Sequence, residues 1–152
     1  MNERVLYEHR QVGWLTVGAS FAIAILICIA AAISVPPERT ISYSLVPILL
    51  VVAALFSTLT VRVTERQLMW FFGVPGIGRS LLLSEIASIR AIETSILEGW
   101  GIHLTWHGWV WNVAGFNAVQ ITLRSGTRFA VGTPEPQAVI DAVQSAGGGT
   151  RS

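Results

Sequence analysis

Residues 100–115, WGIHLTWHGWVWNVAG, decide the fold of the second half of the chain, since they hold four of its six tryptophans. Side chains alternate along a strand, and cross-strand partners share a face. A tight turn at His107-Gly108 therefore gathers one apolar set: Ile102, Leu104, Trp106, Trp109, Trp111 and Val113. The opposite face receives His103, Thr105, Val110 and Asn112. The stretch predicts a half-buried β-hairpin whose aromatic face meets a core or a partner.

The predicted register joins three cross-strand pairs: Trp106 with Trp109, Leu104 with Trp111, and Ile102 with Val113. A slip of one residue would move the whole aromatic set to the opposite face. Because barrel interiors need large aromatic side chains, we expect Trp100, Trp109 and Trp111 in the core. Exposure of part of the cluster would instead mark contact with a partner or with the membrane interface.

The composition favours a membrane protein. Of the 152 residues, 52% are hydrophobic and 12% are charged, whereas soluble domains usually carry about 25% charged residues. A net charge of +1, with ten scattered arginines and no lysine, gives no basic patch for nucleic acid. The single cysteine, Cys28, excludes an intramolecular disulfide and a multi-cysteine zinc site.

Two long uncharged runs occupy the first part of the chain: residues 11–37 and 40–61. A helix needs roughly 20 apolar residues to cross a bilayer. We expect transmembrane helices at residues 14–35 and 45–60, within a membrane region of residues 13–60. The turn between them is Pro36-Pro37-Glu38-Arg39.

Small residues recur in both expected helices: Gly18 and Ala22, Ser20 and Ala24, and then Ala53, Ala54 and Ser57. Small side chains let helix backbones approach each other closely. They either pack the helical hairpin against itself or face another membrane protein or a second copy.

Two other readings of this region stay open. The first apolar run could be a signal peptide with Ala30-Ala31-Ala32 as its cleavage site, although a second run follows at once. The two runs could also be buried helices of a soluble domain, although the later sequence offers little apolar surface to cover them. A lipoprotein signal at Cys28 does not fit, because Ile27 stands where a small residue should be.

Arginine placement predicts the orientation. Four arginines flank the two helices: Arg4, Arg10, Arg62 and Arg66. Arg39 alone occupies the turn, beside Glu38. Basic flanks stay on the cytoplasmic side, so we expect the flank of residues 1–12 and the following domain on the cytoplasmic face of a bacterial inner membrane.

Residues 61–146 change to short alternating segments and predict one small domain. Its expected strands are residues 61–64, 66–72, 81–84 and 86–94, followed by the tryptophan hairpin. A second hairpin, residues 118–123 and 127–132, requires an odd-numbered loop to bring its apolar side chains to one face. Arg124-Ser125-Gly126 fits, with Gly126 in the left-handed position.

One helix completes the domain. Thr133 is the expected N-cap, and Pro134 occupies the first helical position, where its missing N–H is harmless. Val139, Ile140 and Val143 form a narrow apolar stripe. Glycines stop the helix, and residues 147–152 are expected to be a disordered tail.

Several segments of this domain resemble a known family: Gly99-Trp100-Gly101-Ile102, Gly108, Asn112-Val113, Gly115, Ala118-Val119, and Gly126 followed by Val131-Gly132-Thr133. They resemble the bacterial pleckstrin-homology-like (PH-like) domain of small two-helix membrane proteins. The resemblance covers roughly residues 61–146 and implies an all-β barrel covered at one end by the C-terminal helix. Most such proteins lack an assigned activity. The Lys and Arg cluster of phosphoinositide-binding relatives is not matched, since the first loop offers only Glu65 and Arg66.

No motif predicts an enzyme, a cofactor or a metal. His103 and His107 are four residues apart, but on a strand and its turn this spacing does not bring two ligands together, and no cysteine or nearby carboxylate completes a site. No serine lies in a Gly-x-Ser-x-Gly elbow. The glycine-rich loop at residues 73–78 lacks the Lys-Ser/Thr that follows a phosphate-binding loop.

We therefore expect a non-enzymatic, membrane-anchored interaction module. The second helix runs into the first strand with almost no linker, so the domain is held at the membrane surface and recruitment by lipid would be redundant. Tethering raises the effective concentration toward a neighbour, which favours another membrane protein or a second copy as the partner. Strand addition to an open sheet edge is one possible mode.

Two alternatives remain. The protein could be a lipid or envelope-state sensor that reads anionic headgroups with Arg62, Arg66 and aromatic side chains, or an accessory subunit that acts through its helices alone. The candidate interaction surface combines eight residues: Arg62, Arg66, Trp70, Trp100, His103, Trp106, His107 and Trp109.

Overall fold

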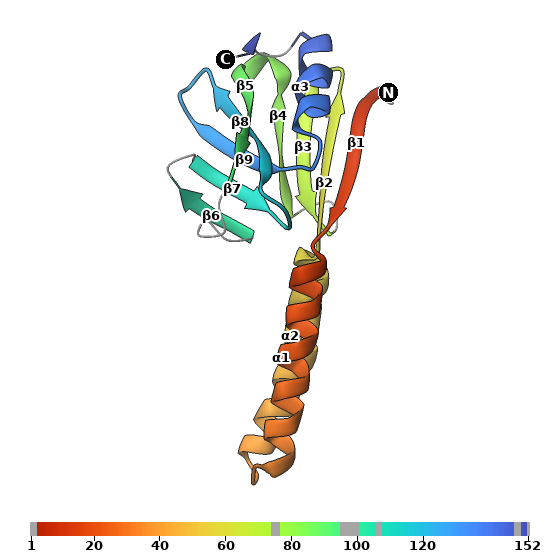
Figure 1. Cartoon of the computed structure of the whole chain (residues 1–152), viewed down its shortest axis with the longest axis vertical. Coiled ribbons are helices and arrows are strands. Elements are labelled where there is room, and N and C mark those ends of the chain that lie inside the picture. Colours follow the sequence, from red (N-terminus) through yellow and green to blue (C-terminus); the bar gives the residue numbers. More distant parts are fainter. Residues whose placement is uncertain (1–2, 74–76, 95–100, 106–107, 148–149, 152) are drawn as a thin grey trace.

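The computed structural model describes residues 3–73, 77–94, 101–105, 108–147 and 150–151. The chain has an α+β fold, in which two long apolar helices form a hairpin that projects from one end of a sheet domain (Figure 1). Both chain termini lie on the sheet domain, away from the tip of the helical hairpin (Figure 1).

The predicted helical hairpin is confirmed. Helix α1 (Trp14–Ile33) and helix α2 (Glu38–Phe56) are long and apolar enough to cross a membrane, with mean hydropathies of 2.5 and 1.9. The second helix begins seven residues earlier and ends four residues earlier than predicted, since residues 58–60 belong to a strand. Its polar start is compatible with a helix because the Ser44 hydroxyl donates a hydrogen bond to the Thr40 carbonyl oxygen at 2.9 Å, and proline is tolerated in apolar helices such as this one.

The small residues of α1 divide into two sets. Ser20, Ala24 and Ala31 are buried and lie on one face of the helix, toward α2. Gly18 and Ala22 are exposed, and a Cβ added at Gly18 would meet nothing within 4 Å. Packing of the helical hairpin against itself therefore uses only part of the small-residue pattern.

The stretch before α1, predicted only as a flank, is a strand. Strand β1 (Val5–Val12) pairs antiparallel with β2 (Thr58–Thr64), so that Val12 lies opposite Thr58. The Gly13 N–H donates a 2.7 Å hydrogen bond to the Ser57 carbonyl oxygen, between the ladder and the helices. The two helices are therefore an insertion between two neighbouring strands.

The strands form two sheets rather than the closed barrel that we predicted. The first sheet has the order β1-β2-β3-β4, with β3 at Gln67–Phe72 and β4 at Gly78–Leu82. A 3₁₀ turn at Leu83–Glu85 replaces the end of the strand predicted at residues 81–84, because the Glu85 carboxylate accepts a hydrogen bond from the Leu82 N–H at 3.2 Å. After this turn the chain enters the second sheet.

The second sheet has the order β10-β5-β8-β9-β7-β6. Its strands are β5 (Ile86–Glu93), β6 (Gly101–Thr105), β7 (Gly108–Asn112), β8 (Asn117–Leu123), β9 (Arg128–Gly132) and β10 (Thr150–Arg151). The hairpin β8–β9 is as predicted: Ile121 lies opposite Phe129, and Gly126 in its three-residue loop has φ +85°. Strand β10 runs parallel to β5, in part of the tail that we expected to be disordered.

An aromatic cluster fills the core between the two sheets. The Trp70 ring lies 5.7 Å from the Phe129 ring and 6.1 Å from the Trp111 ring, between ring centroids. The Phe72 ring stacks on Trp111 at 5.7 Å and also contacts Phe56 of α2 at 5.3 Å. Aromatic packing therefore continues from the sheet domain into the end of a helix.

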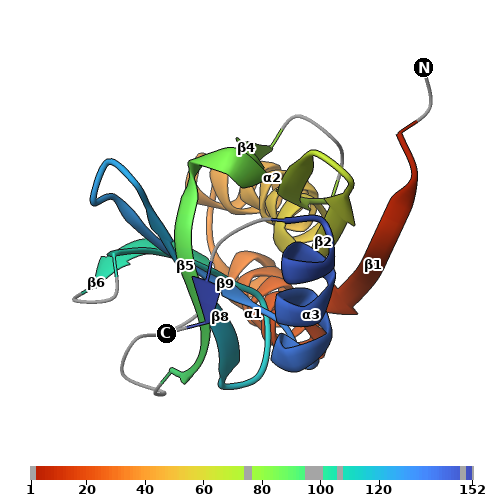
Figure 2. The ribbon, with the colours of Figure 1, turned by 90° about the horizontal axis from the view of Figure 1, so that it is seen from above.

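Helix α3 (Pro136–Ser145) covers one end of the sheet pair (Figure 2). Its predicted stripe of Val139, Ile140 and Val143 is buried in the core, as expected. The helix starts two residues later than predicted, because the Thr133 hydroxyl accepts the N–H of Glu135 at 3.2 Å in a turn before the helix.

The junction between ladder and helices leaves no room for a side chain at Gly13. A Cβ at this position would lie 2.7 Å from the Val113 carbonyl oxygen. We expect Gly13→Ala to lower the free energy of unfolding of the full chain by about 1–3 kcal/mol, as overpacking does. Thermal unfolding in mild detergent measures this difference.

The matched control is Gly18→Ala, because its added methyl group meets open space. We expect the control to change the free energy of unfolding by less than about 1 kcal/mol. Equal effects of the two substitutions would show that the close approach at Gly13 does not matter.

Candidate interaction surface

The tryptophan hairpin is β6–β7, but its register differs from the prediction by two residues. Thr105 lies opposite Gly108, and Leu104 opposite Trp109. Gly108 is therefore the first residue of a strand and not part of the turn. Its backbone lies against Arg128 of β9, where a Cβ would collide with the Arg128 carbonyl oxygen, and this approach sets the register.

The two-residue shift keeps the predicted faces, since side chains alternate with a period of two. Trp111 packs against the core, but its neighbours on the same face are exposed: Trp109 by 45%, Leu104 by 67% and Ile102 by 39%. The expectation that Trp109 lies in the core is therefore wrong. Trp100 and Trp106 lie outside the described residues.

The physical reason is that the hairpin extends past the core. Strand β7 pairs with β9 at Trp109–Trp111, and β6 continues the sheet beyond it with β7 as its partner. Trp111 contacts aromatic rings of the first sheet, whereas side chains farther along the hairpin do not reach that cluster. The exposed side chains Ile102, Leu104 and Trp109 are called the apolar patch below.

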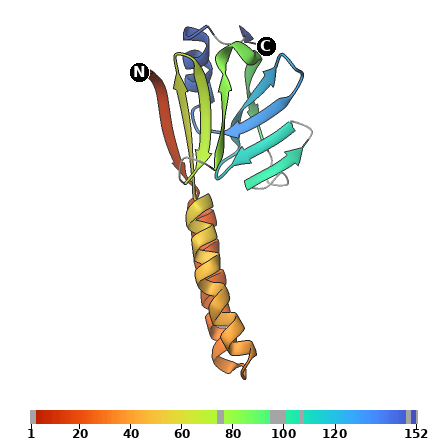
Figure 3. The same cartoon turned by 180° about the vertical axis from the view of Figure 1, so that it is seen from behind.

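The hairpin lies at the end of the domain from which the helices emerge (Figures 1 and 3). It projects sideways from the helix axis when seen from above (Figure 2). The end of β7 is close to the helices, because a cavity of about 250 Å³ is lined jointly by Val113, Thr16 of α1 and Phe56 of α2. The patch is therefore on the part of the domain next to the helix ends.

Strand β6 differs from the other edge strands in charge. Unprotected edges can pair with another chain, and proteins usually protect them with charged residues or by making the strand very short. Strand β1 carries Glu8 and Arg10, β4 carries Arg79, and β10 has only two residues. Residues 99–123, which include β6, contain no Asp, Glu, Lys or Arg.

Three of the other predicted site residues, Arg62, Arg66 and Trp70, lie away from this surface. Arg62 forms a two-point ion pair with Glu8 at 3.0 Å, and this hydrogen bonding raises the pKa of Arg62. Arg66 follows the end of β2 that is remote from the helices, about 20 Å along the seven-residue strand. Trp70 is fully buried in the core. His103 belongs to β6, and His107 lies outside the described residues.

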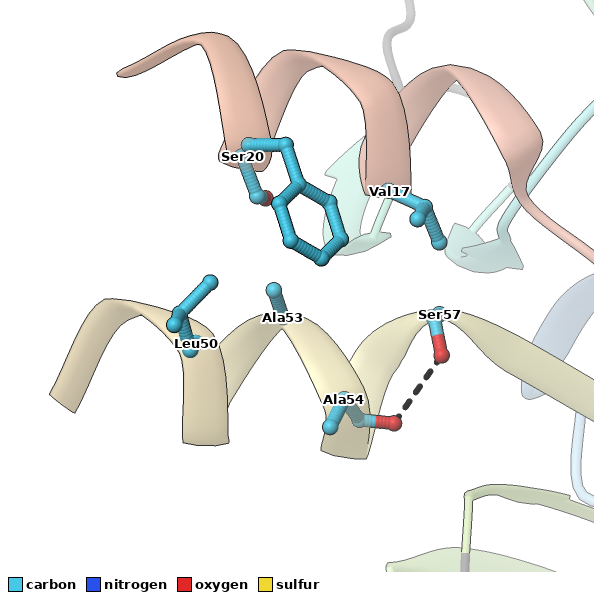
Figure 4. Close-up of a pocket in the computed structure, with 7 residues that line it drawn as sticks. Val17, Ser20, Leu50, Ala53, Ala54 and Ser57 are labelled. Atoms are coloured by element: carbon cyan, nitrogen blue, oxygen red, sulfur yellow. Dashed lines mark hydrogen bonds between the residues drawn. The ribbon is translucent and has the colours of Figure 1, made fainter. Parts of the chain in front are cut away.

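A mainly apolar groove lies between the two helices (Figure 4). It has a volume of about 290 Å³, and Val17, Leu50 and Ala53 are among its lining residues. Its two hydroxyl groups are already hydrogen bonded: Ser20 donates to the Thr16 carbonyl oxygen at 2.8 Å, and Ser57 donates to the Ala54 carbonyl oxygen at 3.0 Å. The groove therefore presents no free reactive group.

One cluster of titratable groups joins β1 to α3. The Tyr7 hydroxyl donates to the Glu135 carboxylate at 3.0 Å, and His9 Nδ1 lies 3.6 Å from it. Burial raises the pKa of Tyr7. Among the described residues, no group of three or more His, Cys, Asp or Glu could hold a metal ion. The cluster connects the first strand to the last helix, a link that no sequence pattern indicated.

Comparisons with known proteins give no family for this chain. No protein-family model, no curated protein and no solved structure matches it. Its function is therefore inferred from its own geometry.

The structure shows that Trp70 is buried and Trp109 is half-exposed, a difference that the sequence did not reveal. We expect Trp70→Ala to lower the free energy of unfolding by about 3–5 kcal/mol, because it removes a fully buried ring from the core. Trp109→Ala removes a half-exposed ring and should cost less than about 1 kcal/mol. Thermal unfolding of both variants tests the assignment, and a larger loss for Trp109→Ala would contradict it.

Proposed function

We propose that the protein is a non-enzymatic, membrane-anchored interaction module. Its β6 edge would pair with a strand of a neighbouring membrane protein, and a second copy of the chain is the simplest such partner. The observation that carries the proposal is the β6 edge itself. It is uncharged, and β7 is its one strand partner among the described residues.

Strand addition suits this edge for two physical reasons. A strand at the edge of a sheet has backbone N–H and C=O groups that face outward and can pair with an extended segment. The strand also carries no charged side chain that would oppose the approach of a second strand. The edges of β1 and β4 are less suitable, because they bear charged side chains.

The attachment of the domain favours a partner that lies in the same membrane. The β1–β2 ladder runs directly into α1 and α2, so the position of β6 relative to the helices is determined by the fold. Two copies in one membrane would hold their β6 edges at the same height. Uncharged edges do not repel each other, and two-fold symmetric pairing is the commonest arrangement of protein dimers.

The proposed location is the cytoplasmic face of a bacterial inner membrane. The paired strands β1 and β2 support a common side for the first residues and for the sheet domain, and the arginines that flank the helices favour the cytoplasm. The headgroup-sensing alternative is less well supported, because Arg62 is paired with Glu8 and Arg66 lies far from the helices.

If two copies of the chain pair through β6, cysteines placed along this strand should form disulfide cross-links between the copies. In a Cys28→Ala background, single cysteines are placed at positions 101–105 and oxidised in native membranes. We expect dimers at these positions, with the yield highest near the two-fold axis, because antiparallel strands bring those residues together. Leu82→Cys is the matched control, since Leu82 is exposed by 47% but lies on the charged edge β4.

A photo-reactive residue at position 104 tests whether the partner is a different membrane protein. The same residue at position 82 is the control. A product with a second copy or with one defined membrane protein at position 104 alone supports the proposal, and Leu104→Lys should prevent co-purification of that partner in mild detergent. No product at position 104, or the same products at both positions, overturns the proposal.

The orientation is tested separately by cysteine labelling in intact cells, in the same Cys28→Ala background. We expect reporters at Arg4 and Ser145 to be protected together from an impermeant reagent, and a reporter at Arg39 to be labelled. Opposite behaviour of Arg4 and Ser145 would contradict a shared side, and joint labelling of both would place the domain outside the cytoplasm.

A further inference from the structure

We infer that the apolar patch of Ile102, Leu104 and Trp109 rests in the interfacial layer of the membrane that the helices cross. The hairpin would then make a second membrane contact that does not span the bilayer. This inference rests on the membrane anchoring proposed above. It concerns the side chains of the hairpin, whereas the proposed protein contact uses the free backbone edge of β6.

The three side chains of the apolar patch are exposed and adjacent, so they form one continuous surface. Leu104 and Trp109 lie directly opposite each other, and Ile102 is two residues before Leu104 on the same face. All three are exposed, whereas Val110 on the opposite face is buried. Contiguous apolar surface that includes an aromatic ring is typical of contact with a partner or with a membrane interface.

The position of the hairpin points to lipid as the occupant. It lies at the end of the domain next to the helices (Figures 1 and 3), and the β7 end shares a cavity with Thr16 and Phe56 in the terminal turns of α1 and α2. Trp14, the first residue of α1, is 75% exposed at this end of the helices. Tryptophan prefers the membrane–water boundary, so this end of the domain is at that depth.

The charge pattern agrees with this placement. The hairpin strands β6 and β7 contain no Asp, Glu, Lys or Arg, and an interfacial segment without charged side chains avoids the cost of desolvating them. The aromatic and aliphatic side chains of the patch match the boundary between headgroups and acyl chains. Because no charged side chain takes part, binding should not require anionic lipid.

A second contact would constrain the domain in a way that the helices alone do not. Two helices define an axis, and the hairpin projects to one side of this axis (Figure 2). Contact of the hairpin with lipid opposes tilting of the domain toward the opposite side. The β6 edge is then kept at membrane level, where a neighbouring membrane protein can reach it.

The test uses the full chain in nanodiscs of phosphatidylcholine. An environment-sensitive fluorophore is attached to Leu104→Cys in the Cys28→Ala background, and its quenching is measured with a lipid that carries a shallow doxyl group and with aqueous iodide. We expect a blue-shifted emission, quenching by the shallow doxyl lipid and protection from iodide. Replacing part of the lipid with phosphatidylglycerol should leave all three unchanged.

Fluorophores at two reference positions distinguish a failure of membrane anchoring from a failure of the hairpin contact. The native Cys28, in the apolar middle part of α1 and exposed, reports on membrane anchoring through a deep doxyl lipid, and Ser145→Cys on α3 should respond to iodide alone. Loss of quenching at Cys28 would overturn the anchoring itself.

With Cys28 quenched, two results at position 104 would overturn only the hairpin contact. Free access of iodide would show that the patch faces water, and protection from both quenchers would show that protein covers it. A strict requirement for phosphatidylglycerol would instead indicate headgroup recognition and would also overturn the inference.

Discussion

The antiparallel pairing of β1 with β2 is the constraint on which the rest of this structure depends. It joins residues that are more than forty positions apart and closes on the hydrogen bond between the Gly13 N–H and the Ser57 carbonyl oxygen. Beyond this bond the same two chain segments continue as α1 and α2. The two-stranded ladder therefore continues directly into the helix pair.

The junction is reinforced from the domain side. Val113 packs against Gly13, the Gly73 N–H donates to the Thr58 carbonyl oxygen at 3.0 Å, and the ring of Phe56 contacts Phe72 in the core. These contacts come from both sheets and from both helices. The position of the β6–β7 hairpin beside the helices follows from them.

Local sequence patterns predicted the helices and strands that depend mainly on neighbouring residues. The helices follow from two long uncharged runs, the β8–β9 hairpin from period-two alternation and Gly126, and the buried face of α3 from the spacing of its valines and Ile140. Strand β1 has only a weak signal, because the partly buried positions that follow Tyr7 on the same face are the polar residues His9 and Gln11. Of the candidate site residues, Trp109 and His103 lie on the hairpin, but Trp70 and Arg62 belong to the other sheet.

The sequence by itself determined the apolar helix pair, the alternating domain and the uncharged tryptophan-rich stretch, since each depends on neighbouring residues or on composition. Only the tertiary structure decided the register of that stretch, because Gly108 lies against Arg128 of a distant strand. It also decided how far each ring is covered: Trp111 is partly buried and stacks on Phe72, whereas Trp109, two residues earlier, is 45% exposed. Burial depends on what the fold brings opposite each residue, and no local pattern contains that information.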